Sequence, residues 1–300
     1  MLWRAGLALL LAGALSAQTI ETLAKGTLPE HWPTGGPNCM EMQDFYIHEY
    51  NQSFYILRQS GCTDYEKPFL YLIFGSDQAM LWDTGSRNSR VREAVDRLID
   101  RWLKENKRAS IPLVVMHSHK HGDHIWGDFQ FAGRPDTTLV KPDLASVKDF
   151  FGFQNWPEEI RTFDLGGRPM DLVPIPGHTD DSFALYDRQT GILLTGDTVY
   201  PGRLYVSDFE AFRSSIHRLA AFTADKPIAH VLGNHIEQTT TPFVDYPTGT
   251  KYQPEEHELA LSAGNILELD RALQAMKEPK TLKLRDLTIS VRGPSRGRGQ

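Results

Sequence analysis

The segment His117-Ser118-His119-Lys120-His121-Gly122-Asp123-His124 decides the fold, and it directly follows the apolar run 111–116. Four of its residues form the pattern H-x-H-x-D-H: His119, His121, Asp123 and His124. Imidazole nitrogens and carboxylate oxygens are ligands that divalent zinc accepts. Four such ligands within six residues are too crowded for one tetrahedral ion, so some must serve a second metal. The alternative is a polar loop with solvated histidines.

A two-metal site needs further ligands from distant parts of the sequence, and three later segments offer them. Each places a polar residue after an apolar run: His178 in Ile175-Pro176-Gly177-His178-Thr179, Asp197 in Leu194-Thr195-Gly196-Asp197-Thr198, and His235 in Val231-Leu232-Gly233-Asn234-His235. A glycine precedes or nearly precedes each candidate, which allows a tight turn and close backbone approach. Singly each segment is weak evidence, because Gly-Asp is more often a turn and a lone histidine is more often a core residue.

Hydrophobic patterning predicts a chain of many strands with helices between some of them. Strands are expected at 45–50, 53–58, 69–74, 79–82, 111–116, 172–175, 183–186, 192–195 and 228–232, with a closing strand at 281–291. Helices are expected from residue 91 to 103, from 209 to 219 and, as a long helix, over 255–276. Because no repeat or linker divides the chain, we expect one α/β or α+β domain with sheet between helical layers.

The first residues have the pattern of a secretory signal. Arg4 is followed by the apolar run 5–15, which is too short to span a bilayer, and small residues end at Ala17. We expect a signal peptide at 1–17, an extended arm at 18–38, a hydrolase domain at 39–292 and a disordered tail at 293–300. The mature protein would be exported, periplasmic or secreted, without stable membrane insertion. An N-terminal anchor and a buried helix are the alternatives.

Charge and cysteine content limit the kinds of partner and of structural site that we expect. Lys and Arg number 32 against 38 Asp and Glu, so the formal charge is −6, and no long basic run is present. This argues against general nucleic-acid binding. Two cysteines are too few for a cysteine-rich zinc module. Export makes a Cys39–Cys62 disulfide possible, and two unpaired thiols are the alternative. The oligomeric state stays open.

In the order of these motifs, over roughly residues 70–236, the chain resembles the metallo-β-lactamase-fold hydrolase superfamily. The resemblance implies an αββα four-layer sandwich with metals at one edge between two sheets. It also implies the metal ligands: His119, His121 and His178 for one zinc, Asp123, His124 and His235 for the other, and Asp197 as the bridge. Asp83, in Trp82-Asp83-Thr84-Gly85, is similar to a buried family aspartate that orients ligands, and its alternative is a simple turn residue. His117 matches no ligand position, so we expect it to support ligands or to pack.

The implied activity is hydrolysis, in which a zinc-bound hydroxide attacks a small carbonyl substrate: an ester, a lactone or an amide. Asp123 would accept a hydrogen bond from the nucleophile. Tyr200 is similar to a tyrosine that lactonases of the superfamily place opposite the attacked carbonyl oxygen, and its alternative role is packing. Aromatic residues are candidates for a pocket wall, although we expect at least two of them in the core: Trp126, Phe129, Trp156 and Tyr205.

Other functions stay open within the same resemblance. Zinc β-lactamases of the family usually have Cys or Ser where this chain has Asp197, yet hydrolysis of β-lactam antibiotics remains an alternative. A bridging Asp is typical of glyoxalase II-like thioesterases, lactonases, nucleases and phosphodiesterases, of which the nucleases usually carry an extra domain. His121 replaces a Glu of the flavin-linked di-iron relatives, which favours two zinc ions per chain, but iron is possible and iron-dependent sulfur dioxygenases share much of the motif. The non-enzyme alternative is a metal-binding scaffold.

Overall fold

The computed structural model describes residues 23–35 and 43–291. The expected signal peptide, Cys39 and the expected tail at 293–300 therefore lie outside the described residues. Cys62 is not a free thiol. None of the helices in the described ranges has both the length and the apolar character needed to cross a bilayer.

The first sheet has the strand order β1-β2-β3-β4-β5-β6. Its strands are β1 Phe45–Asn51, β2 Phe54–Gln59, β3 Phe69–Phe74, β4 Ala79–Trp82, β5 Leu113–Met116 and β6 Thr137–Leu139. The first four are antiparallel neighbours, whereas β4, β5 and β6 run parallel. Every residue of β2 to β5 is buried, as expected for strands with both faces covered.

The second sheet has the order β13-β12-β10-β9-β8-β7. Its strands are β7 Arg161–Asp164, β8 Pro169–Pro174, β9 Phe183–Asp187, β10 Ile192–Leu194, β12 His230–Leu232 and β13 Ala260–Leu261. Because β9 is antiparallel to both β8 and β10, and β10 is parallel to β12, the strands β8, β10 and β12 point in one direction. A smaller third sheet contains β11 Arg203–Val206, β14 Leu282–Lys283 and β15 Thr288–Val291.

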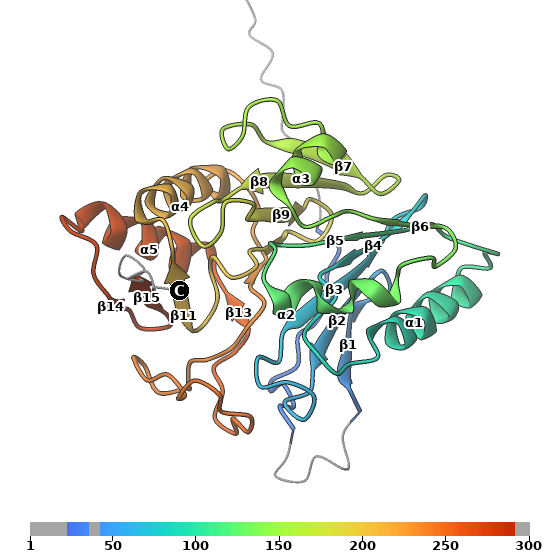
Figure 1. The fold of residues 1–300 in the computed structure, drawn as a ribbon, viewed down its shortest axis with the longest axis horizontal. Helices are drawn as coiled ribbons and strands as arrows, with labels where there is room; N and C mark the ends of the chain where they lie inside the picture. The colour runs from blue at the N-terminus through green and yellow to red at the C-terminus, as the bar shows by residue number, and fades with distance from the viewer. Residues whose placement is uncertain (1–22, 36–42, 292–300) are drawn as a thin grey trace, which may run out of the picture.

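Helices cover the outer faces of the two large sheets, as Figure 1 shows. Helix α1 (Val91–Glu105) packs on the first sheet, and α4 (Phe209–Thr223) and α5 (Ala263–Ala275) pack on the second. Between the sheets lies a core that includes Trp82 and Met116 from one sheet and Leu185 and Leu194 from the other. Three short helices lie near the sheet edges: α2 Gly122–Ile125, the 3-10 helix η2 Trp126–Gln130, and α3 Leu144–Phe151. The expected αββα sandwich is confirmed.

Two expectations about the C-terminal part were wrong. The helix expected over 255–276 begins only at Ala263, because Ser262 and Asn265 form a capping box there and β13 precedes it. The strand expected over 281–291 is a hairpin of β14 and β15, whose innermost pair is Lys283 with Thr288. Patterning also missed β6, β7, β11, β13 and α3. Of these, β6 and β7 are partly exposed and lack an apolar run.

Candidate metal centre

The expected ligands follow strands of both sheets at one edge of the sandwich. The loop with His119, His121, Asp123 and His124 follows β5, while His178, Asp197 and His235 follow β8, β10 and β12. Since the strands of each sheet that lead into the site point in one direction, their carboxyl ends meet at a common edge (Figure 1). The fold thus brings together ligands separated by more than one hundred positions in the sequence.

Three imidazoles and one carboxylate oxygen form the first donor group. His121 Nδ1 lies 3.0 Å from His119 Nε2 and 2.9 Å from His178 Nε2. Asp197 Oδ2 lies 3.8 Å from His119 Nε2 and 3.7 Å from His178 Nε2. The four donor atoms all lie within 4.8 Å of one another, so one cation can bind among them.

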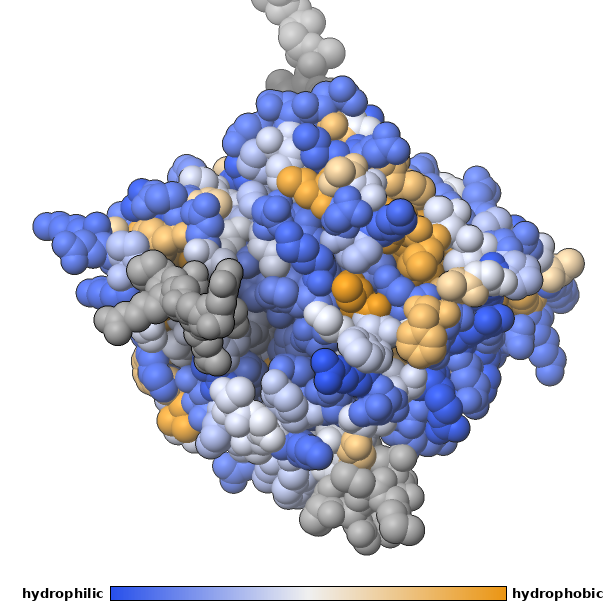
Figure 2. Space-filling model, viewed as in Figure 1, coloured by the Kyte–Doolittle hydropathy of each residue, from blue (hydrophilic) through white to orange (hydrophobic). Residues whose placement is uncertain are grey.

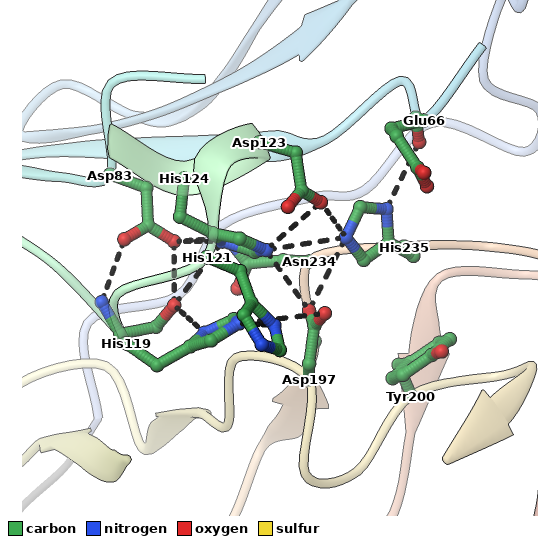
Figure 3. A network of polar contacts seen from close by, with 12 residues as sticks. Glu66, Asp83, His119, His121, Asp123, His124, Asp197, Tyr200, Asn234 and His235 are labelled. Atoms are coloured by element: carbon green, nitrogen blue, oxygen red, sulfur yellow. Dashed lines mark hydrogen bonds and ion pairs between the residues drawn. The ribbon is translucent and has the colours of Figure 1, made fainter. Parts of the chain in front are cut away.

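The second donor group contains Asp123, His124, His235 and the other oxygen of Asp197. Asp123 Oδ2 lies 3.2 Å from both His124 Nε2 and His235 Nε2. Asp197 Oδ1 lies 3.4 Å and 3.3 Å from the same two nitrogens. In Figure 3, Asp197 lies below the rings of His124 and His235. Each oxygen of Asp197 therefore faces a different donor group, as a bridging carboxylate requires.

Two observations fit a cation at each group. Asp197 Oδ1 is buried and accepts a hydrogen bond from none of the described residues. His121 Nδ1 faces two other ring nitrogens, and one proton cannot satisfy both contacts. Because buried polar atoms are normally satisfied, Asp197 Oδ1 has a place for a partner that a cation would fill. Each group offers three nitrogens and one oxygen, or two of each, which is a donor set that suits zinc.

The opposite nitrogens of three of the expected ligand rings are held by acceptors. His178 Nδ1 donates to Tyr205 O at 2.7 Å, and His235 Nδ1 donates to Glu66 O at 3.0 Å. His124 Nδ1 donates to Asp83 Oδ2 at 2.9 Å. A carbonyl or carboxylate oxygen can only accept, so each ring carries its proton on Nδ1. Nε2 is then left for a cation, and the ring is held in orientation.

Asp83 lies at the centre of a buried hydrogen-bond network (Figure 3). Besides the bond from His124, it accepts Ser118 N at 2.7 Å, Ser118 Oγ at 2.9 Å and Asn234 Nδ2 at 2.6 Å. Its backbone has φ of 67°, in the left-handed region that Asp tolerates better than most residues. Asp83 thus contacts the ring of one expected ligand and the sequence neighbours of two others. This is where an orienting residue must lie, and that role stays a prediction.

The carboxylates of the site favour positive charge beside them, whether as a proton on a histidine ring or as a cation. Burial, with His124 nearby, holds the pKa of His119 well below its usual range, so its ring is neutral. Burial alone would raise the pKa of Asp197, but His235 and His124 outweigh it and hold that pKa well below its usual range. Burial would lower the pKa of His124, yet Asp123 and Asp197 raise it well above its usual range. The carboxylates are therefore ionised and attract positive charge.

Tyr200 has a different environment from the one expected of an oxyanion donor. Its hydroxyl donates to Arg203 O and lies 3.2 Å from Glu237 Oε2, and its ring packs edge-on against His235. Burial raises the pKa of this phenol well above its usual range. Since the one hydroxyl proton is engaged with a backbone carbonyl, the geometry favours packing. The catalytic role of Tyr200 stays a prediction.

Sequence reasoning did not single out several residues that support the site. Ser118 and Asn234 directly precede His119 and His235, so adjacency to a ligand was the available signal. The carbonyls of Glu66 and Tyr205 had no signal, because any residue type offers a backbone oxygen. These contacts depend on which loops the two sheets bring together.

Of the four aromatic candidates for a pocket wall, Trp156 alone packs against the core between the sheets, whereas at least two were expected there. Trp126 and Phe129 are 45% and 69% exposed, and Trp156 and Tyr205 are partly buried. The guanidinium of Arg87 lies 4.6 Å above the Trp126 ring. On the face of the molecule that Figure 2 shows, apolar side chains gather on one side of a shallow hollow. Trp126 and Phe129 belong to η2, which directly follows the ligand-bearing α2.

Comparison with known proteins identifies the family of this site. The family model described as the metallo-beta-lactamase superfamily matches residues 67–230, which is more than half of the chain. This range includes every expected ligand except His235. The fold also resembles the solved metallo-beta-lactamase from Pontibacter korlensis, with a TM-score of 0.50 and 16% identity, over 77% of this chain and 100% of that one.

Two curated relatives are more similar in sequence. An acyl-coenzyme A thioesterase of Homo sapiens, MBLAC2, is 28% identical over 167 residues, covering 45% of this chain and 59% of the relative. A hydroxyacylglutathione hydrolase of Chromohalobacter salexigens is 30% identical over 116 residues, covering 37% and 44%. The matched part of this chain thus spans about half the length of these relatives.

Proposed function

Because this chain belongs to the metallo-β-lactamase superfamily of hydrolases, we propose that it is a dinuclear zinc hydrolase of small carbonyl substrates. The substrate would be an ester, thioester, lactone or amide. The observation that supports two metals is the pair of donor groups that share Asp197, one through each oxygen. The imidazole-rich donor set supports zinc.

When bound, the two cations would supply an activated water and would polarise the attacked carbonyl oxygen. The residues of this chain hold the cations and manage the proton. Asp123 is the most exposed of the three carboxylates in the site, with a side chain 20% exposed against 9% for Asp197 and 0% for Asp83. Asp123 thus lies at the opening, where a carboxylate can accept a proton from the attacking water. Asp197 and Asp83 stay buried behind it.

Among the substrate classes, thioesters have specific support. The names of both relatives above denote hydrolysis at an acyl group: one is an acyl-coenzyme A thioesterase and the other a hydroxyacylglutathione hydrolase. The position of Asp197 agrees with this, because the resemblance associates a bridging Asp with glyoxalase II-like thioesterases and lactonases. Thioesters are therefore the first substrates to test, ahead of β-lactams.

The location we propose is the periplasm or the medium, after removal of residues 1–17. The supporting observation is the charged, apolar and small-residue order of that segment. N-terminal sequencing of protein from separated cell fractions tests it. A mature N-terminus near residue 18 outside the cytoplasm is expected, and an intact Met1 in the cytoplasm would contradict export.

The function is tested by metal analysis together with a substrate panel of an acyl-coenzyme A, S-lactoylglutathione, an aryl ester, a lactone and nitrocefin. We expect two zinc ions per chain and turnover of a thioester, ester or lactone. The variant His178→Asn should lose zinc and activity. His257→Asn is a matched control, because His257 contacts Asp286 away from the donor groups.

Each contrary result points to a named alternative. One iron and no zinc, in protein from cells given both metals, would overturn the zinc assignment and favour oxidation of a thiol. Turnover of nitrocefin alone would identify a β-lactamase with an atypical bridge. Fully loaded protein with no turnover of any substrate would favour a metal-binding scaffold.

A further inference from the structure

The loop with four of the ligands is closed by a contact between side chains at its two ends. His117, at the start of the loop, donates from Nε2 to Asp128 Oδ1 at 2.8 Å. The side chains are 1% and 22% exposed, so the contact is largely shielded from water. We propose that His117, Asp128 and Thr84 form a staple that positions Asp123 and His124 for cation binding. This inference rests on the two-metal function proposed above.

Thr84 connects the staple to the strand that precedes Asp83. Thr84 Oγ1 donates to the same Asp128 oxygen at 2.8 Å. Its backbone N donates to His124 O at 2.7 Å, so one residue contacts both the ligand and the staple. Asp128 Oδ1 thus accepts two hydrogen bonds, one from the start of its own loop and one from the turn after β4. A carboxylate accepts such bonds more strongly than a neutral group does.

The backbone around the staple is packed too closely to move freely. Trp126 N donates to Gly85 O at 3.1 Å. A Cβ atom at Gly127 would lie 2.4 Å from Thr84 O, so only glycine fits between η2 and this turn. Asp128 therefore fixes the far end of a short segment that is pressed against the turn after β4. Within that segment lie Asp123 and His124.

The staple acts more on the second donor group than on the first. Asp123 and His124 both lie in α2, and both belong to the second group. In the first group, His178 comes from the other sheet, His119 precedes α2 and contacts Ser118 Oγ, and His121 lies at the N-cap of α2, outside its helical residues. Loss of the staple should therefore weaken cation binding at the second donor group more than at the first. In this role Asp128 is a positioning residue, since it contacts neither donor group directly.

The test is zinc binding by the full chain in competition with a chromophoric chelator, and absorption spectra of the cobalt-substituted protein. The variant Asp128→Ala should bind the second zinc 10-fold to 100-fold more weakly, with the first zinc unchanged. Asp128→Asn keeps one acceptor oxygen and should recover part of the affinity. The cobalt spectrum of Asp128→Ala should lose the absorption of one site and retain the other.

Asp143→Ala is the matched control. Asp143 caps α3 by accepting a hydrogen bond from Ser146 N at 2.9 Å, and it belongs to neither of the two metal-donor groups. Its replacement should lower the free energy of unfolding, as the loss of a helix cap does, without a change in zinc affinity. Should Asp128→Ala not fold, Thr84→Val removes the Thr84 hydroxyl at constant size, with its contacts to Asp128 and to His124 O, and is read in the same way.

The outcomes separate the staple from the function on which it rests. If the wild type binds two zinc ions and Asp128→Ala binds both with unchanged affinity, the staple is overturned. It is also overturned if both zinc ions weaken equally, as a general loss of structure would cause. A wild type that binds one zinc would contradict the two-metal function. The staple would then be supported if Asp128→Ala lowers the affinity for that zinc, and overturned if it does not.

Discussion

Replacing Asp83 by Asn changes the chemistry at the centre of the site at nearly constant shape. Asp83 accepts Ser118 N through Oδ1, and it accepts Ser118 Oγ, His124 Nδ1 and Asn234 Nδ2 through Oδ2. Asn has the same size and also tolerates the positive φ of this position. The substitution therefore replaces one acceptor oxygen with an amide NH₂ and leaves the backbone as it is.

The expected cost follows from counting the donors that lose their acceptor. With the amide oxygen kept on Ser118 N, the NH₂ group faces the three donors that Oδ2 had accepted. The Ser118 hydroxyl can rotate and accept, but His124 Nδ1 and Asn234 Nδ2 cannot. A buried donor without an acceptor costs about 1–3 kcal/mol, so the free energy of unfolding should fall by roughly 2–6 kcal/mol. Zinc affinity should fall about 10-fold to 100-fold, because the orientation of His124 is no longer held.

The assay is denaturant unfolding of chelator-treated protein, together with zinc titration. Asp171→Asn is the matched control: Asp171 in β8 is also buried, and it accepts bonds from Thr162 and Arg188 away from the donor groups. The control should lose stability and keep its zinc affinity. Asp83→Asn protein with unchanged zinc affinity and an unfolding free energy within about 0.5 kcal/mol of wild type would refute the reasoning.

Three further predictions test single residues. Asp197→Asn should lower zinc occupancy and cut turnover by about 100-fold or more, and a variant with two metals and full rate would show that Asp197 is not the bridge. Tyr200→Phe should leave kcat on a lactone or aryl ester little changed at equal zinc content, because its hydroxyl donates to Arg203 O; a loss of about 10²–10³ would instead establish the oxyanion role. Burial lowers the pKa of Lys67 to about 8 from its usual 10.5, so the unfolded chain binds more protons between these pH values and stability rises with pH across that window. The unfolding free energies of wild type and Lys67→Met are measured from pH 7 to 11. Relative to the variant, the wild type should gain roughly 3 kcal/mol of stability over this range, whereas a constant difference between the two proteins would contradict the lowered pKa.

The sequence by itself was sufficient to identify the candidate ligands and the fold class. Ligand chemistry is a property of the residue type, so His119 to His124 could be recognised as a cluster without any structure. The short apolar runs before His178, Asp197 and His235 predicted strands, and each of these residues does follow a strand. Local composition thus places a residue in the chain relative to a strand end, which is enough to propose that it reaches the site.

Only the tertiary structure decided how those residues meet. Nothing in the pattern around Asp197 tells which oxygen faces which donor group, that Asn234 shares Asp83 with His124, or that the Tyr200 hydroxyl donates to a carbonyl. The contact between His117 and Asp128 was equally invisible. Each of these is a directional contact, made either between separate loops or within one loop. Its geometry is set by the packing of two sheets against a shared core, and residue type and spacing along one segment do not contain that information.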